Sequence, residues 1–278
     1  MCSCKNNEQS KNNGNPMGNK KIVEIKNDYQ PGIDWKLVWA DEFESNEIDQ
    51  NNWSLQIVKA GRFNEEWQRY TASSENAYVK DSCLVIKANH ESNKHGLDQY
   101  TSARLHTAHK QTWRYGKIAA KIKLPHGKGI WPAFWMLGAN IDENGGDTPW
   151  PQCGEVDILE LYGSKDDAVI EVNAHYANAA DAHEMMGAES YKLNKGKFTD
   201  DFHIFELEWN NEHLSWFVDG NKFASMKIKD EEFSEFHENF FILFNIAVGG
   251  THAGRPDEST VFPQYMYVDW VRVYKKEN

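Results

Sequence analysis

The sequence of 278 residues lacks several features that would assign it to common protein classes. It has no run of 18 or more apolar residues, so it contains no candidate transmembrane helix. Basic residues do not balance the acidic ones: there are 30 Lys and Arg against 42 Asp and Glu, a net charge of −12. Because nucleic-acid binding depends on Lys and Arg at phosphates, this deficit argues against a nucleic-acid partner and, less strongly, against sulfated polysaccharides.

Cysteine is also scarce, with only four residues in the chain. Cys2, Cys4, Cys83 and Cys153 include no Cys-x-x-Cys pair, which argues against a structural zinc site. The spacing of Cys83 and Cys153 is compatible with two free, buried thiols and also with a disulfide, and spacing alone does not decide between them.

Residues 1–31 contain few apolar side chains, and we expect them to form a disordered N-terminal tether. Their one apolar cluster, at residues 22–25, is too small to bury a core of its own. Cys2 follows Met1 with no hydrophobic segment before it, which suggests that a signal was removed and Met1 added for expression. Cys2 would then be the lipidated first residue of a bacterial cell-surface or extracellular lipoprotein; the alternative is a plain disordered end. Deletion of 1–31 should leave the domain unaffected.

The remaining residues, 32–278, are predicted to form one all-β domain. Residues 115–124 place aliphatic side chains on one face and lysines on the other, as in a strand with one solvent-exposed face. Asp219-Gly220-Asn221 predicts a hairpin. About fourteen short strands, no internal repeat and one short helix at 230–239 favour a β-sandwich (jelly roll) of two curved antiparallel sheets with a concave cleft.

Three carboxylates lie within six residues in the segment 150–160, WPQCGEVDILE. Glu155 and Asp157 share one face of a strand, because side chains alternate with period two, and the aliphatic residues beside them point into the core. Glu160 is out of phase and would point into that core, where an unpaired carboxylate is costly. A one-residue β-bulge near residues 158–159 would restore the phase and place all three acids on one face.

Two carboxyl groups on either side of one bond are the requirement of glycoside hydrolysis, where one serves as nucleophile or base and the other as acid. Glu155 and Glu160 would lie roughly 13 Å apart along an ideal strand, so their carboxyls converge only if the sheet curves toward the acidic face. The alternative interpretation of Glu-x-Asp-x-x-Glu is an acidic strand edge that faces solvent.

Two further motifs distinguish these alternatives: IWPAFWMLG at residues 130–138 and FNIAVGG at residues 244–250. With the acidic strand they make the chain closely resemble glycoside hydrolase family 16, and within it the laminarinase-like endo-β-1,3-glucanases. The resemblance runs from about residue 35 to residue 274. The inserted residue in the acidic motif is similar to that of the laminarinase type, whereas the lichenase type lacks it.

The resemblance implies an endo-acting, retaining enzyme for β-1,3-glucan (laminarin), with mixed-linkage β-1,3-1,4-glucan as a further substrate. It implies Glu155 as nucleophile, Glu160 as general acid/base and Asp157 between them, where it would hydrogen-bond and orient Glu155. Two acids this close cannot ionise independently, so we expect the pKa of Glu160 to be raised. Catalysis would need no cofactor, and the enzyme would be a monomer.

The chain is rich in aromatic residues, 13% of the total, which serve either as bulky core or as stacking surfaces for sugar rings. Trp131 and Trp135 share a strand face and would form a stacking platform, with core packing as the alternative. Arg104 would reach the cleft, with a surface salt bridge as its alternative. The resemblance implies seven substrate-binding residues: Asn76, Arg104, Trp131, Trp135, Trp150, His175 and Asn245.

A structural calcium ion on the convex side is a further implication of the resemblance. Its ligands would come from Glu42, from a carbonyl at Ser82 and from Asp269, because oxygen ligands suit calcium. The usual glycine of that turn is replaced here by Ser82, and a plain surface carboxylate is the alternative for Asp269.

Two other functions remain open from sequence. A non-catalytic glucan-binding lectin could share the fold, since fold does not fix function, although a lectin has no need of three acids. A galactan hydrolase of agarase or carrageenase type would share the bulged motif. The acidic charge and the tryptophan motif favour a neutral glucan.

Overall fold

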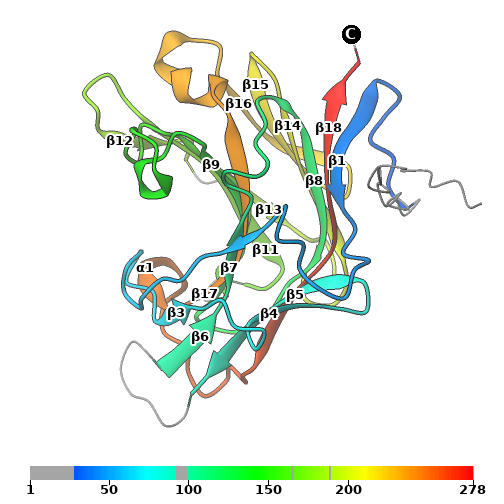
Figure 1. Ribbon diagram of the computed structural model, residues 1–278, viewed down its shortest axis with the longest axis vertical. Coiled ribbons are helices and arrows are strands. Elements are labelled where there is room, and N and C mark those ends of the chain that lie inside the picture. Colours follow the sequence, from blue (N-terminus) through cyan, green and yellow to red (C-terminus); the bar gives the residue numbers. More distant parts are fainter. Residues whose placement is uncertain (1–27, 92–98, 164–165, 188, 278) are drawn as a thin grey trace, which may run out of the picture.

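The computed structural model describes residues 28–91, 99–163, 166–187 and 189–277. Within these ranges the chain forms two β-sheets that lie face to face, with apolar side chains of both sheets packed between them (Figure 1). The predicted all-β sandwich of jelly-roll type is confirmed.

The ten-stranded sheet, which we call the outer sheet, carries the longest strand, β18, near its centre. Ile118, Ala120 and Ile122 of β8 are fully buried, as the alternation predicted. Asp219 and Gly220 both have positive φ in the turn between β15 and β16, as a tight hairpin requires. In spatial order the strands are β16 (Asn221–Lys227), β15 (His213–Val218), β14 (His203–Trp209), β8 (Gly116–Lys123), β18 (Gln264–Lys276), β5 (Cys83–His90), β6 (Tyr100–Ser102) and β3 (Gln68–Tyr70), with β1 (Trp35–Asp41) paired to β18 and β4 (Ala77–Lys80) to β5.

The eight-stranded sheet, which we call the inner sheet, holds the acidic strand, β10, between two long neighbours, β11 and β9. Long strands pair with β10 on both sides, before and after a shift in register at residues 158–159, so its side chains have fixed directions. In spatial order the strands are β12 (His183–Met185), β11 (Val169–Ala177), β10 (Glu155–Glu160), β9 (Ile130–Gly138), β17 (Phe240–Val248), β7 (Arg104–His106) and β2 (Ser54–Leu55), with β13 (Glu189–Lys192) paired to β11.

The predicted β-bulge is present in β10. Asp157 pairs with Trp135 of β9, and the next pair joins Leu159 to Phe134, so that Ile158 is the extra residue. The side chains of Ile158 and Leu159 are both buried in the core. An unpartnered carboxylate in that core would be costly, and the extra residue turns Glu160 back toward the open face.

Three short helical segments lie wholly within the described residues and connect strands. η3 (Glu231–His237) confirms the helix predicted at 230–239, as a 3-10 helix, while η2 (Asp142–Asn144) and α1 (Gly250–Ala253) were not predicted. The described residues contain eighteen strands, more than the fourteen expected, because several have only two to four residues. None of their helices has the length and apolarity that spanning a bilayer would take.

The predicted boundary of the N-terminal tether is wrong for residues 28–31. Residues 1–27 lie outside the described residues, but Asp28 and Tyr29 pack on the outer sheet. The Tyr29 ring lies 5.3 Å from Trp270, and its hydroxyl donates a 2.7 Å hydrogen bond to Glu206. The Asp28 carboxylate pairs with Lys121 at 2.6 Å. A deletion that ends at residue 31 therefore removes part of the folded domain.

We expect Tyr29→Ala to lower the free energy of unfolding by about 1–3 kcal/mol, since it removes a half-buried ring and one hydrogen bond. Tyr29→Phe keeps the ring and should cost only about 1 kcal/mol, because the bond to Glu206 alone is lost. Urea denaturation of both variants measures the two contributions. Equal stability of Tyr29→Ala and the parent protein would show that this contact does not persist in solution.

Candidate active site

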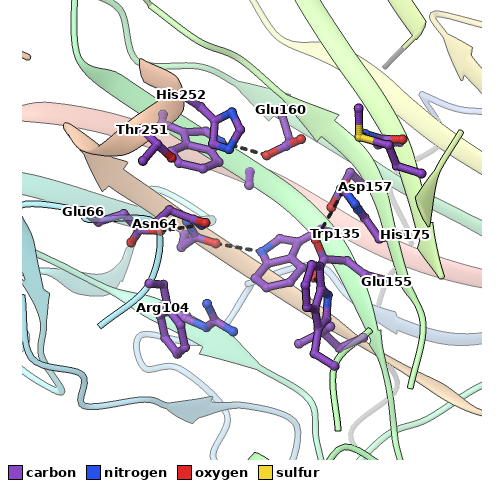
Figure 2. A pocket seen from close by; sticks show the side chains of 18 of the residues that line it. Asn64, Glu66, Arg104, Trp135, Glu155, Asp157, Glu160, His175, Thr251 and His252 are labelled. Carbon is purple, nitrogen blue, oxygen red and sulfur yellow. Dashed lines mark hydrogen bonds and ion pairs between the residues drawn. The ribbon is translucent and has the colours of Figure 1, made fainter. Parts of the chain in front are cut away.

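A cleft with a volume of about 910 Å³ crosses the inner sheet, and all three acids of β10 line it. Figure 2 shows Glu155, Asp157 and Glu160 along one strand, with Trp135 on the neighbouring strand. The bulge thus brings together the three carboxylates that sequence reasoning singled out. Other lining residues come from β7, β9, β11, β12, β17 and the loops around them, among them Asn64, Glu66, Arg104, Trp131, Trp150, Tyr162, Glu171, His175, His183, Asn245 and His252.

Glu155 is held from two sides. The indole N–H of Trp150 donates to its Oε2 at 3.1 Å, and Nε2 of His175 lies 3.8 Å from its Oε1. Burial raises the pKa of Glu155 to about 8, and the charge of Asp157 acts in the same direction. The positive charges of His175 and Arg104 oppose this rise, so they favour the ionised form that a nucleophile needs.

Asp157 is the most deeply buried of the three acids, at 3% exposed. Its Oδ2 lies 3.1 Å from Nε2 of His175, while its backbone carbonyl accepts a hydrogen bond from Trp216. Burial raises the pKa of Asp157 to about 8. Polar atoms of Asp157, Glu155 and His175 all lie within 4.8 Å of one another. The contact recorded for the Asp157 carboxylate is thus with His175, where the sequence predicted a hydrogen bond to Glu155.

Glu160 accepts a 2.9 Å hydrogen bond from the indole N–H of Trp131. Burial and the charge of Asp157 raise its pKa to about 8, and hydrogen bonds from Tyr162 and Trp131 oppose the rise. Three carboxyls so close together, one buried and two half-buried, cannot all be ionised at neutral pH. Glu155, Asp157 and Glu160, which we call the catalytic row, can therefore offer one protonated carboxyl beside one ionised carboxylate. Acid catalysis with a nucleophile requires this combination.

Trp135, Asn245 and Arg104 form one side of the cleft. The Trp135 indole donates to Oδ1 of Asn245 at 2.7 Å, and the Arg104 guanidinium stacks 4.6 Å from the Trp135 ring. Phe63 lies on Arg104 as well, at 4.8 Å. These contacts fix the Trp135 ring and place a cation within the cleft.

Trp131, which was predicted to form a stacking platform with Trp135, has different surroundings from Trp150. Trp131 is only 7% exposed, and its ring lies against Tyr162 and His252 while its N–H holds Glu160. Trp150 is 44% exposed at the cleft and offers a more open ring face than Trp131. Trp131 is therefore placed to orient Glu160 rather than to offer an open platform.

Asn76 does not line the cleft, and its assignment as a substrate-binding residue is wrong. It is 2% exposed, and its amide nitrogen donates to the Lys87 carbonyl at 2.9 Å and to Thr101 at 3.1 Å. Its amide oxygen accepts from the Thr71 hydroxyl. The Asn76 side chain therefore ties β5 and β6 to the segment before β4, and both its amide nitrogen and its amide oxygen bond within the protein.

The match of this chain to one protein family agrees with the geometry of the cleft. The family described as "Glycosyl hydrolases family 16" matches residues 63–272. The chain belongs to this family. A beta-glucanase from Rhodothermus marinus is 36% identical over 251 residues, which cover 87% of this chain and 85% of that protein.

Solved structures of laminarinases have the same fold. The catalytic domain of an endo-1,3-beta-glucanase (laminarinase) from Thermotoga petrophila is 41% identical, with a TM-score of 0.76 over 88% of this chain and 99% of that one. The laminarinase from Rhodothermus marinus is 35% identical, with a TM-score of 0.77 over 88% of this chain and 98% of that one.

Several cleft residues of this family 16 chain were not predicted from sequence. Asn64 and Glu66 come from a loop that bridges to Gly249, and Glu66 accepts hydrogen bonds from Gln68 and Tyr70. Burial raises the pKa of Glu66. The two consecutive glycines at 249–250 were the one local indication that another segment approaches there. Tyr162, His183 and His252 gave no indication of their own.

The residues predicted to bind calcium do not fit a cation site. Arg272 forms two hydrogen bonds with the Glu42 carboxylate, at 2.7 and 2.8 Å, and both side chains are buried. Asp269 pairs with Lys121 at 3.0 Å. Both carboxylates are thus already neutralised by protein cations, which would also repel a divalent ion. Ser82 lies in the β4–β5 turn with a φ of 55°.

We therefore expect the melting temperature to be the same in excess calcium and in excess chelator. A ligand that binds only the folded state raises stability in proportion to the logarithm of its concentration, so a filled site would be visible. Scanning calorimetry in the two buffers tests this directly. A rise of several degrees with calcium would show that the folded protein binds the ion and would overturn this expectation.

Proposed function

We propose that this chain is an endo-acting β-1,3-glucanase that hydrolyses laminarin with retention of anomeric configuration. The observation that carries the proposal is the bulged strand β10, which presents Glu155, Asp157 and Glu160 together to an open cleft. The beta-glucanase and laminarinases to which the chain is similar support the same substrate class.

In the first step, a carboxylate oxygen of Glu155 attacks the anomeric carbon. The bond from that carbon to the leaving oxygen breaks, and Glu160 donates its proton to this oxygen. The raised pKa of Glu160 keeps the proton available near neutral pH. Trp150 and His175 hold the attacking carboxylate in place.

In the second step, water attacks the glycosyl-enzyme from the face that the leaving group vacated. Glu160, now ionised, accepts a proton from this water, and the bond to Glu155 breaks. Each step inverts the anomeric carbon, so the product retains the β configuration. Both steps use only side chains of the protein, with no cofactor.

A neutral substrate fits the charges that line the cleft. Besides the catalytic row, Glu66, Asp142, Glu143 and Glu171 line it, against the cations Arg62 and Arg104. An anionic sulfate would meet this excess of carboxylates, which argues against a carrageenan-type galactan. A non-catalytic lectin is less well supported, because three adjacent carboxyls, one buried and two half-buried, cost stability that sugar binding alone does not require.

Product analysis on laminarin tests the proposal. An endo enzyme with an open cleft should release short oligosaccharides early, cut lichenan at a comparable or lower rate, and leave agarose and carrageenan intact. High-performance anion-exchange chromatography of early time points resolves these products. Release of glucose alone would contradict endo cleavage, and binding of laminarin without any product would favour the lectin.

We further propose that the enzyme acts as a monomer at or outside the cell surface, and that Cys2 anchors it through a lipid. This rests on the chemistry of Cys2 and its polar sequence context alone. Metabolic labelling with a fatty-acid analogue should mark the native protein, and Cys2→Ser should remove the label.

A further inference from the structure

His183 lies on the edge strand β12 and contacts the active site without a role in the two steps above. Its Nε2 is 2.8 Å from Nδ1 of His175, and the two rings stack with centroids 5.1 Å apart. On its other side the His183 ring lies 4.7 Å from Trp150. It therefore contacts both side chains that hold Glu155.

These two side chains reach the catalytic row directly. Nε2 of His175 lies 3.1 Å from Asp157 and 3.8 Å from Glu155, and Trp150 donates to the other oxygen of Glu155. Figure 2 shows His175 beside Asp157 and Glu155. A path of contacts thus leads from the sheet edge to both oxygens of Glu155.

The protons on the two imidazoles follow from their neighbours. Nε2 of His175 faces two carboxylates, so it carries a hydrogen and donates it. Nδ1 of His175 is then within hydrogen-bond distance of a second imidazole nitrogen, and one hydrogen lies between them. If that hydrogen belongs to His175, the ring is a cation next to Glu155 and Asp157, and His183 is its neutral acceptor.

We propose that His183 is a positioning residue of the hydrolase: it accepts the hydrogen bond of protonated His175, packs on Trp150, and through both keeps Glu155 ionised and oriented. This rests on the proposed function, with Glu155 as nucleophile. Burial and the charge of His175 lower the pKa of His183, which keeps it neutral and suited to accept.

Among the groups around the pair, the carboxylates of β10 favour the same charge distribution. The negative charge of Glu184, on β12, acts to raise the pKa of His183. The same carboxylate accepts a hydrogen bond from Asn178. Arg104, elsewhere in the cleft, carries a positive charge that acts to lower the pKa of Glu155. The negative groups facing His175 come from β10: Glu155, Asp157 and Glu160.

The test compares two replacements of His183. His183→Phe keeps a flat ring against Trp150 and His175 but removes the acceptor, whereas His183→Gln keeps an acceptor that does not titrate. For His183→Phe we expect kcat on laminarin to fall about tenfold or more with KM within roughly twofold, since a hydrogen bond to a charged group is lost. The acid limb of the kcat/KM profile should move to higher pH, because Glu155 loses a neighbouring cation.

His183→Gln should recover most of kcat and return the acid limb to its original position. Glu184→Gln, on the same strand, is the matched control and should leave both unchanged. If His183→Phe has the acid limb and kcat of the parent enzyme, the proposal is overturned and His183 is only a packing residue. Recovery of neither property in His183→Gln overturns it as well.

Nitrogen NMR of the histidine rings tests the proposal without activity. At the pH of maximal activity both ring nitrogens of His175 should be protonated in the parent protein, and one should lose its proton in His183→Phe. An unprotonated Nδ1 in the parent protein overturns the proposal, whatever the activity. Failure of the parent protein to cut any glucan would instead overturn the proposed function, because the ring protonation can be read independently.

Discussion

Replacement of Glu155 by glycine should abolish hydrolysis of laminarin, with a loss of about 10⁴-fold or more, because no group remains to attack the anomeric carbon. Added azide should then enter the space left by the carboxyl and attack from the same side. Only one inversion would occur, so the product should be an α-glycosyl azide. Proton NMR of the product, from a substrate with an activated leaving group, reads the configuration directly.

The parent enzyme provides the complementary result. If the carboxyls of Glu155 and Glu160 lie ~5–5.5 Å apart, as in retaining enzymes, no water fits between nucleophile and sugar, and the first product should be the β-anomer. Early appearance of the α-anomer would mean that Glu155 is not the nucleophile. Glu143→Gln, which removes a different carboxyl of the cleft lining, is the matched control and should keep most activity.

The folding of Glu155 variants can be assessed from the raised pKa of that group. Folding raises the pKa of Glu155 from 4.5 to about 8, so the ionised form opposes folding. Its contribution to stability is fully present below pH 4.5 and is lost as the pH rises to 8. Glu155→Gln should therefore be at least as stable as the parent at pH 8, and thermal melts would separate lost chemistry from lost fold.

The sequence predicted the catalytic row because every step depended on local rules. Period-two alternation determined which side chains of β10 share a face. Because Glu160 is out of phase, the strand had either to bury its charge in the core or to contain a bulge. A bulge costs less free energy than a buried, unpaired carboxylate, and the structure contains this bulge at Ile158. The two-sheet sandwich followed from the same alternation in the other segments and from the resemblance to one family, whereas the order of the strands came only from the structure.

The errors share a different cause, which is that the deciding partner lies far away in the sequence. Asn76 satisfies its amide on β5 and β6, and nothing near residue 76 shows this. Tyr29 is one aromatic in a polar stretch, and its aromatic partners are on β18, some 240 residues later. Asp269 is paired by Lys121 of the adjacent strand β8, a contact that only the sheet order reveals.

Replacement of Glu160 by alanine should separate the two chemical steps that the parent enzyme combines. With laminarin, whose leaving group needs a proton, the rate should fall about 10²–10⁴-fold, the usual contribution of a general acid. With an activated aryl leaving group, bond cleavage needs little protonation, so the glycosyl-enzyme on Glu155 should form and accumulate as a burst. Its hydrolysis should be slow, because no base remains to accept a proton from water.

Azide needs no base, so it should accelerate turnover of Glu160→Ala and yield a β-glycosyl azide after two inversions. This is the opposite configuration to the product expected from Glu155→Gly, and the pair of azide products therefore assigns the two roles without reference to rate. The pH profile adds a third measure. In the parent enzyme kcat/KM should fall as the pH rises through about 8, where Glu160 loses its proton. With the aryl substrate this alkaline limb should disappear in Glu160→Ala, and its persistence would mean that another group, such as Asp157, supplies the proton.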